Sequence, residues 1–453
     1  MTNLSTTQPN ETPRVHASAN VDVALSESAT ATRSSRFGSR ELPPRPQNTR
    51  FLSFDIWRGI ACLMLLFFHA TFYADRSWGT TEKSWGALGL RLSDYLWVGV
   101  PMFFVVSGYC IAASIDAKRR KPHSIGDYFL RRIRRIYPPL WAALALAICF
   151  SIAVGQIASI QTQCKQLPHL GEFTIWQWAG NFLAIESWLP LFSGAGEKIY
   201  VMPNTWTLCY EEQFYAVAGF MLLLASRRFF AAAFVVTLLT LVVRHGCRAN
   251  DIEIVGFFFD GHWLLFAAGL FAYQYLHYAS NRLKLITLGG LVAGMVYALL
   301  DRRGQSEYLH RHLDDYIFAA CGFAIALILM WRWDKSISQW RLLRPLAWCG
   351  KISYSIYLTH YPIVVVIASV FSMFGVHDDK SVLLYVLPTC LIVTLPIAWL
   401  FYQGVERKFL NSGVAQKDGS RVPLALPAWP LSEWFQRKMS LCKVVARKLY
   451  SGN

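Results

Sequence analysis

The chain has 453 residues, of which 54% are hydrophobic and only 16% are charged, and its formal net charge is +16. This composition is too apolar for an ordinary soluble protein, and it predicts a chain that crosses a membrane several times. Basic residues collect on the cytoplasmic side of membrane proteins, so the positive charge does not indicate nucleic-acid binding.

The ten cysteines form neither a CxxC pair nor a zinc-type spacing, and the sequence predicts no metal site. Most of them lie within apolar runs, where a thiol usually serves as a small packing residue. Cys164 and Cys247 fall in segments expected at the outer face, so at most one disulfide is predicted.

Residues 1–50 are rich in Ser, Thr, Pro and Arg, which predicts a disordered cytosolic tail without a signal peptide. Residues 51–410 are predicted to form an all-α membrane domain, a bundle of about ten transmembrane helices. The apolar runs are 54–74, 93–115, 138–157, 205–225, 229–245, 254–276, 285–300, 315–331, 350–374 and 381–404. Residues 411–453 are predicted to be a basic cytosolic tail, either an amphipathic helix on the inner leaflet or a disordered segment.

Lys and Arg are distributed unevenly between the loops that join these runs. The tails and loops on one side hold 31 Lys and Arg, and the loops on the other side hold 11. Since positive charge stays inside, both termini are predicted to be cytosolic, and the protein to be a multi-pass protein of the inner (plasma) membrane. The Trp-rich stretch 171–192, which polar residues interrupt, is predicted to be an interfacial or re-entrant segment at the outer face.

The first apolar run carries Arg58 near its start and His69 eleven residues later. Eleven steps of about 100° come within roughly 20° of three full turns, so both side chains lie on one helix face about 16 Å apart. An ionisable group within a membrane is a functional hypothesis. The structural alternatives are an arginine that anchors the helix at the interface and a neutral packed histidine.

The fourth run opens with NTWTLCYEEQFY, which places Glu211 and Glu212 one to two turns below the outer surface. Adjacent helical residues point about 100° apart, so only one of them can face the bundle centre well. His360, in GKISYSIYLTHYP of the ninth run, is also expected near mid-membrane. Together with His69 these residues predict a polar cavity, although His360 could be only a packed histidine before Pro362.

The sequence RRIRRIYPP places four arginines directly before the third run. Such a cluster commonly does no more than set topology. A guanidinium also offers a planar fork to phosphate oxygens, so this cluster is a candidate to bind a phosphorylated cytosolic substrate.

Five motifs, in order along the chain, resemble those of the acyltransferase-3 family of integral-membrane acyltransferases. They are R-x10-H from Arg58 to His69, FFVVSGY at 103–109, R-x-x-R-I-x-P at 132–138, WTLCYEEQFY at 206–215 and SYSIYLTH at 353–360. The fourth motif selects Glu211 over Glu212. The resemblance covers about residues 50–410.

The resemblance implies transfer of an acyl group, commonly acetyl, from cytosolic acyl-coenzyme A to a hydroxyl, often of a sugar in a surface or exported glycan. It implies that His69 accepts the acceptor's proton or is transiently acylated, with support from Glu211 and Arg58. The residues implied to bind the acyl-coenzyme A are Arg58, Arg132, Arg135, Ser107, Tyr354 and His360. No metal is implied, and the oligomeric state is not indicated. No extracytoplasmic hydrolase-like domain is expected, because only about 45 basic-rich residues follow the last run.

Two other classes of function fit an apolar bundle with buried polar residues. A secondary transporter or flippase would use those residues as a translocation path rather than as a reaction centre. A membrane sensor or scaffold would use them only as a structural core. The five ordered motifs favour the enzyme.

Overall fold

The structure is a computed structural model, and it describes residues 49, 51–74, 84–119, 125–156, 168, 170–191, 199–250, 252, 256–300 and 313–410. All of these belong to one compact unit, Pro46–Asn453. Both predicted tails, apart from Thr49, and also Cys164 lie outside the described residues. The predicted tail conformations and the predicted limit of one disulfide therefore stay predictions.

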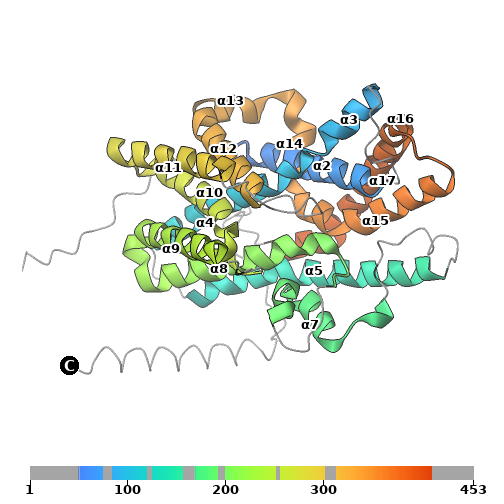
Figure 1. The fold of residues 1–453 in the computed structure, drawn as a ribbon, viewed down its shortest axis with the longest axis horizontal. Coiled ribbons are helices and arrows are strands. Elements are labelled where there is room, and N and C mark those ends of the chain that lie inside the picture. The colour runs from blue at the N-terminus through green and yellow to red at the C-terminus, as the bar shows by residue number, and fades with distance from the viewer. Residues whose placement is uncertain are drawn as a thin grey trace, which may run out of the picture. The chain divides into compact units, whose positions relative to one another are not determined.

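The described elements are all helical, which confirms the predicted all-α bundle. Each of the ten apolar runs corresponds to one long helix (Figure 1). These helices are α2 (Phe54–Phe72), α4 (Gly99–Lys118), α5 (Ile125–Gly155), α8 (Trp206–Ala225), α9 (Phe229–Ala249), α10 (His262–His277), α11 (Asn281–Leu300), α12 (Leu313–Met330), α15 (Ser353–Met373) and α17 (Leu387–Phe401).

Eight helical runs among the described residues are long and apolar enough to cross a membrane. The difference from the ten predicted spans has two causes. Only a short turn separates α8 from α9, and the two together form one 47-residue run, Pro203–Ala249. The helix α10 has 16 residues, fewer than the roughly 20 that a spanning helix needs. The number of crossings therefore stays a prediction.

Short elements join the long helices. They are α3 (Trp85–Ser93), η2 (Leu96–Val98), η3 (Leu170–Glu172), α7 (Ile175–Leu183), η4 (Glu186–Leu191), η5 (Pro203–Thr205), η6 (Ser226–Arg228), η7 (Phe258–Asp260), η8 (Trp331–Trp333), α13 (Asp334–Gln339), η9 (Arg341–Leu343), α14 (Arg344–Lys351), α16 (Asp379–Ser381) and α18 (Arg407–Phe409). Two π-helical turns, η10 (Val382–Val386) and η11 (Tyr402–Glu406), flank α17. The described part of the Trp-rich stretch holds only η3, α7 and η4, which are too short to span a membrane.

The third long helix begins earlier than the sequence predicts. The expected span starts at 138, whereas α5 begins at Ile125 and contains Pro138 and Pro139 in its interior. Each proline removes one hydrogen bond within the helix, yet the flanking residues keep it continuous because arginine is a good helix former. The hydroxyl of Tyr354 donates to the carbonyl of Ile136 at 2.9 Å, beside the interrupted turn. The basic motif therefore lies on a helix rather than in a loop.

Glycines bring α4 and α10 into direct backbone contact. A Cβ on Gly269 would collide with the carbonyl oxygen of Val105, and a Cβ on Gly108 would collide with that of Phe266. Small residues at such crossings let two membrane helices approach closely. This pair forms part of the main buried core, in which α9 to α12 gather on one side of the view in Figure 1.

The start of α2 is fixed by the segment α13–α14. A Cβ on Gly350 of α14 would collide with the carbonyl oxygen of Asp55. The carboxylate of Asp334 accepts hydrogen bonds from the backbone N–H groups of Leu52 and Ser53, at 2.7 and 2.9 Å. These contacts satisfy donors at a helix N-terminus that would otherwise be unpaired. They set the position of the helix that carries the R-x10-H motif.

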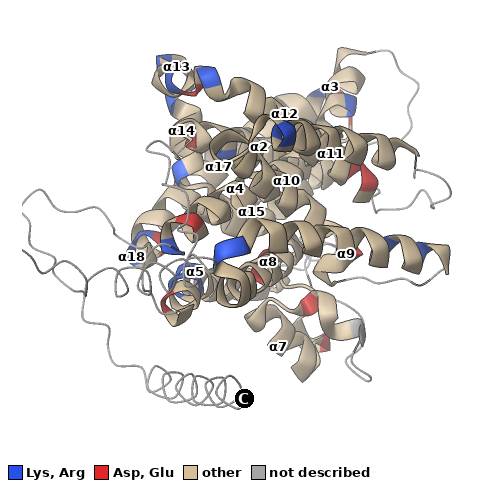
Figure 2. Cartoon of the chain, turned by 90° about the vertical axis from the view of Figure 1, so that its left-hand side faces the viewer, with Lys and Arg blue, Asp and Glu red and all other residues tan. Residues whose placement is uncertain are grey.

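Lys and Arg gather toward helix ends (Figure 2). One group lies on α13, α14, α18 and the first half of α5, which the sequence analysis assigns to the cytosolic side. A smaller group lies at the C-terminal end of α9, which is expected on the outer side. This separation is the one that the predicted topology requires, and the sidedness of the bundle stays a prediction.

Candidate active site

His69 on α2 and His360 on α15 face each other within the bundle. His69 Nδ1 and His360 Nε2 lie 2.9 Å apart, and the ring centroids are 5.0 Å apart. The other nitrogen of His360, Nδ1, lies 3.0 Å from the carbonyl oxygen of Ile356 and 2.9 Å from that of Tyr357. His360 is buried, whereas His69 keeps partial exposure. The structure thus joins two of the residues that the sequence analysis singled out.

The hydrogen bonds of this histidine pair define where its protons lie. A carbonyl oxygen can only accept, so His360 Nδ1 carries a proton. With both rings neutral, His360 Nε2 is an acceptor and His69 Nδ1 is the donor to it. The electron lone pair on His69 Nε2 takes no part in the hydrogen bond between the two histidines. The less buried ring therefore presents a base.

Glu211 on α8 contacts residues of α4 and of its own helix. Its Oε1 accepts a hydrogen bond from Ser107 Oγ at 2.9 Å and a short one from the hydroxyl of Tyr215. The guanidinium of Arg132 lies over the ring of Tyr215, 4.5 Å from its centroid. Glu211 is therefore connected through Tyr215 to the basic motif on α5.

The sequence analysis places Glu211 and His69 at similar depth, and the helix positions show why they are separated. Asn204, just before α8, donates its Nδ2 to the carbonyl of Tyr357 at 2.6 Å, which is the carbonyl that also contacts His360. Glu211 lies seven residues farther along, a rise of about 10 Å on a helix. Among the described residues, the hydrogen bond of His69 goes to His360, and none joins His69 to Glu211.

Arg58 lies at the other end of α2 from His69. Its Nη2 is 3.4 Å from Sγ of Cys110 on α4, and its Nη1 is 3.8 Å from the carboxylate of Asp55. The side chain is partly exposed and faces α4. It is not one of the residues that line the basic cavity described next.

A cavity of about 180 Å³ lies between α4 and the basic motif of α5. Its lining residues are Ser114, Lys118, Tyr128, Arg131, Arg132 and Arg135. Nζ of Lys118 is buried, has no hydrogen-bond partner in the described part of the chain, and lies 5.3 Å from the centroid of the Tyr128 ring. A lining with four cations and no carboxylate suits a polyanion such as a chain of phosphates.

Arg132 and Arg135 are predicted individually and Arg131 only as one of the four clustered arginines, whereas the sequence does not indicate Lys118. The α5 members of this cavity, at 128, 131, 132 and 135, follow the i, i+3, i+4, i+7 spacing of one helix face. That spacing was visible in the sequence, but α5 was expected to begin only at 138. Lys118 comes from the end of α4, so only the packing of the two helices adds it.

The tyrosines of the SYSIYLTH motif connect α15 to its neighbours. The ring of Tyr354 stacks on that of Tyr357, with 12° between the planes. The hydroxyl of Tyr357 donates to the carbonyl of Asn204 at 2.7 Å and lies 3.1 Å from the hydroxyl of Thr207. Tyr354 and His360 do not line the basic cavity, so their predicted role in donor binding stays a prediction.

Two further glutamates, the buried Glu186 and the partly buried Glu212, have no role predicted from the sequence. Oε2 of Glu212 accepts from the hydroxyl of Tyr137 at 2.8 Å, and its Oε1 is buried without a partner among the described residues. Glu186, the first residue of η4, is fully buried, and its Oε1 lies 3.4 Å from the hydroxyl of Thr205. Burial raises the pKa of the Glu186 carboxyl to about 7. Glu212 was visible in YEEQ, whereas a glutamate within a Trp-rich segment gave no signal.

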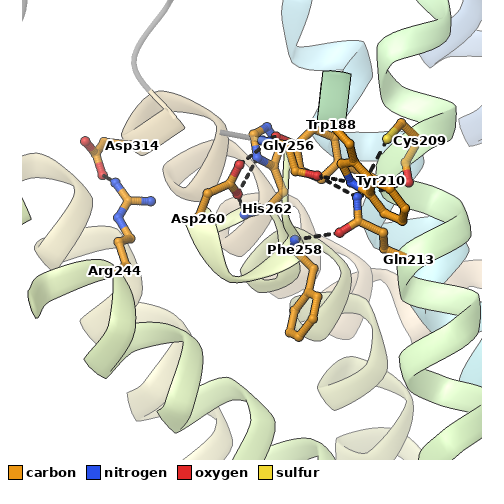
Figure 3. A network of polar contacts seen from close by, with 10 residues as sticks. All are labelled: Trp188, Cys209, Tyr210, Gln213, Arg244, Gly256, Phe258, Asp260, His262 and Asp314. Atoms are coloured by element: carbon orange, nitrogen blue, oxygen red, sulfur yellow. Dashed lines mark hydrogen bonds and ion pairs between the residues drawn. The ribbon is translucent and has the colours of Figure 1, made fainter. Parts of the chain in front are cut away.

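A separate polar network holds the segment before α10 against α8 (Figure 3). The hydroxyl of Tyr210 donates to the carboxylate of Asp260 at 2.6 Å. The carbonyl of Gly256 accepts hydrogen bonds from the side chains of Gln213 and Trp188, both at 2.7 Å. Because Trp188 belongs to η4, this network also fixes η4 onto α8.

Curated proteins with sequence similarity to this chain include proteins named as O-acetyltransferases and a putative membrane-bound transacylase. The chain is 22% identical over 342 residues to O-acetyltransferase OatA of Staphylococcus aureus, which covers 70% of this chain and 53% of OatA. It is 27% identical over 372 residues to the putative membrane-bound transacylase BcsY of Komagataeibacter xylinus, covering 81% and 84%. It is 22% identical over 345 residues to the putative peptidoglycan O-acetyltransferase YrhL of Bacillus subtilis, covering 70% and 51%.

The chain spans about half the length of OatA and YrhL, whereas its match to BcsY covers most of both proteins. No solved structure matches the chain. The model of the acyltransferase-3 family, an acyltransferase domain, matches residues 51–403, which contain all five sequence motifs and the histidine pair. The chain therefore belongs to the acyltransferase-3 family.

Proposed function

We propose that this protein is a membrane O-acyltransferase that moves an acyl group, in the first instance acetyl, from cytosolic acyl-coenzyme A to a hydroxyl of a surface or exported glycan. The observation that carries the proposal is the hydrogen bond between His69 and His360. It leaves His69 Nε2 available as a base on a partly exposed ring, and a hydroxyl needs such a base to become a good nucleophile.

The proposed donor site begins at the basic cavity. Acyl-coenzyme A carries several phosphate charges, and Lys118, Arg131, Arg132 and Arg135 would bind them. From Arg132 a continuous set of contacts leads through Tyr215 to Glu211 and Ser107. The acyl end would follow this polar route from the cytosolic side toward the histidine pair.

Two of the roles suggested by the resemblance change in this proposal. Glu211 balances the charge of Arg132 along the donor route, because its contacts lead to that arginine rather than to His69. His360 takes the supporting role, because it accepts the hydrogen bond of His69 while its own N–H is held by backbone carbonyls. Arg58 is proposed to assist the donor from the opposite end of α2.

In the proposed reaction, the acceptor hydroxyl gives its proton to His69 Nε2 while its oxygen attacks the carbonyl carbon of the thioester. The hydrogen bond to His360 stabilises the positive charge that His69 then carries. The tetrahedral intermediate collapses with cleavage of the carbon–sulfur bond, and the leaving sulfur takes the proton from His69. The products are an acyl ester and free coenzyme A.

The glycan acceptor is supported by the relatives, two of which are named as O-acetyltransferases and one of these for peptidoglycan. The proposed site of action is the inner (plasma) membrane, with both termini cytosolic. This sidedness follows from the distribution of Lys and Arg between the loops.

The test uses the purified full chain in lipid nanodiscs with acetyl-labelled acetyl-coenzyme A and cello- and chito-oligosaccharides as acceptors. We expect label in ester linkage on an oligosaccharide, and a loss of at least about 100-fold in His69→Ala, the scale of general base catalysis. His245→Ala is the matched control, because His245 is an exposed histidine at the end of α9.

A folded His69→Ala protein with wild-type turnover would overturn the assignment of the base. Label retained on wild-type protein but not on His69→Ala would show that His69 is acylated in transit. In sealed vesicles, passage of substrate without ester formation would support the transporter alternative.

A further inference from the structure

Three side-chain oxygens, one of them beside the histidine pair, are buried and have no hydrogen-bond partner among the described residues. They are Oε2 of Glu186, Oδ1 of Asn204 and Oε1 of Glu212. Glu186 is fully buried, and Asn204 is 7% exposed. A buried acceptor without a partner is costly, and most buried polar groups in proteins are satisfied. Three of them in linked segments indicate a place where hydrogen-bonding groups of another molecule are expected.

The contacts of Asn204 and Glu186 link their oxygens to the catalytic pair. The carbonyl of Tyr357 accepts from Asn204 Nδ2 at 2.6 Å and from His360 Nδ1 at 2.9 Å, so both groups meet at one oxygen. Asn204 is followed in the chain by Thr205, whose hydroxyl lies 3.4 Å from Glu186. Glu186 is therefore linked to His360 through the residue pair Asn204–Thr205 and the carbonyl of Tyr357.

Glu212 joins the same region through Tyr137. The hydroxyl of Tyr137 lies 2.8 Å from Glu212 Oε2 and 3.2 Å from the carbonyl of Leu183, three residues before Glu186. Trp188 of the same segment and Gln213 of α8 both donate to the carbonyl of Gly256, which links this segment to α8. The three oxygens are thus fixed by several elements, as a preorganised binding site requires.

Two hydroxyls contact these carboxyl groups, and the proton of each is already committed. Thr205 has one hydroxyl proton, and it goes to the carbonyl of Met202 at 2.7 Å, which is much closer than Glu186. Tyr137 has one hydroxyl proton, and its nearer acceptor is the other oxygen of Glu212. The unpartnered oxygens therefore need hydrogen-bond partners from outside this set.

We propose that Glu186, Asn204 and Glu212 form the acceptor subsite, and that they bind the hydroxyls of a polyhydroxylated acceptor, a carbohydrate, that flank the hydroxyl to be acylated. The proposal rests on the proposed function and adds the residues that select its acceptor. A sugar suits this set because each hydroxyl can both donate and accept, and several lie side by side on one ring. An alcohol with a single hydroxyl could present its reacting oxygen to His69 but would leave the three oxygens unsatisfied.

The experiment compares a sugar with a simple alcohol as acceptors for the purified full chain and acetyl-coenzyme A. The probes are methyl glucoside, which has several hydroxyls, and cyclohexylmethanol, which has one. Glu186→Met and Glu212→Met remove the acceptor oxygens at similar volume. We expect each to lower kcat/KM for methyl glucoside by about 10-fold, the effect of one lost hydrogen bond. Values for cyclohexylmethanol and the Kd for coenzyme A should stay within about 2-fold, since those ligands do not use these oxygens.

Glu172→Met is the matched control, because Glu172 is exposed on η3, shortly before η4. Glu186→Gln keeps the shape and one acceptor oxygen, so it covers the case in which Glu186→Met does not fold. We expect Glu186→Gln to lower the ratio of kcat/KM for methyl glucoside to kcat/KM for cyclohexylmethanol less than Glu186→Met does. A folded variant with an unchanged ratio overturns the proposal and assigns the three oxygens to bound water alone.

Failure of the proposed function would give a different result. In that case wild-type protein acylates neither probe, and the subsite is then tested by saturation-transfer NMR with methyl glucoside. Binding of the sugar to wild-type protein that is lost in Glu186→Met and Glu212→Met supports the subsite, and absence of binding to wild-type protein overturns it.

Discussion

His69 Nδ1 and His360 Nε2 lie 2.9 Å apart although 291 positions separate the two residues in the chain. Because His360 Nδ1 faces backbone carbonyls, the proton between the rings belongs to His69 Nδ1 when both rings are neutral. His360, whose own N–H faces backbone carbonyls, therefore orients the proposed base His69 in the way that a carboxylate orients the histidine of many hydrolases.

The first prediction concerns that orientation. His360→Leu removes the acceptor for His69 Nδ1, so we expect transfer to fall by about 100-fold while Kd for coenzyme A is unchanged, since general base catalysis contributes roughly 10²–10⁴-fold. His360→Gln keeps an acceptor oxygen and should recover activity to within about 10-fold of wild type. The measurement is initial rate per folded molecule. Equal activity of the two variants would show that His360 acts only through packing.

The second prediction concerns the basic cavity. Arg132→Met with Arg135→Met should weaken binding of coenzyme A, because charge-assisted phosphate contacts contribute roughly 1.5–3 kcal/mol each. Arg134→Met is the matched control, since Arg134 lies on the same helix but does not line the cavity. Calorimetric titration with coenzyme A measures both. An equal loss of coenzyme A binding in the Arg134→Met control would show that the effect comes from general surface charge and not from the cavity.

The third prediction concerns the backbone contact between α4 and α10. Gly269→Ala places a Cβ against the carbonyl of Val105, and we expect a loss of about 1–3 kcal/mol of stability through overpacking. Gly290→Ala, on α11, meets no atom within 4 Å and should be neutral or stabilising by up to about 1 kcal/mol, because alanine favours helix. Denaturation in detergent, followed by tryptophan fluorescence, compares the two. Equal effects would contradict the assigned helix crossing.

The fourth prediction concerns pH. Burial raises the pKa of Glu186 from 4.5 to about 7, so the folded protein holds this proton more tightly than the unfolded chain does. The stability linked to Glu186 is therefore fully present below pH 4.5 and is lost as pH rises to about 7, by on the order of 3 kcal/mol. Glu186→Gln cannot ionise, so its stability relative to wild type should increase across that window. A pH-independent difference between the two proteins would refute the shift.

Much of the fold follows from local pattern. Each of the ten apolar runs forms a long helix. A run of apolar residues can enter a membrane only if its backbone N–H and C=O groups bond to one another, and a helix achieves this within the run itself. Arg58 and His69 share a helix face for the same local reason, the period of the helix. The predicted start of the third long helix at residue 138 was wrong. Pro138 and Pro139 are tolerated inside α5, because neighbouring helices pack around it.

The sequence by itself determined the class of fold and the family, and it singled out His69, His360, Arg132 and Arg135. Only the tertiary structure decided which of these groups meet. His69 bonds to His360 rather than to Glu211, because the long-range packing of α2, α15 and the start of α8 sets their relative depth. The unpartnered oxygens of Glu186, Asn204 and Glu212 likewise come from separate segments, and only the packing of those segments decides whether a buried polar group finds a hydrogen-bond partner.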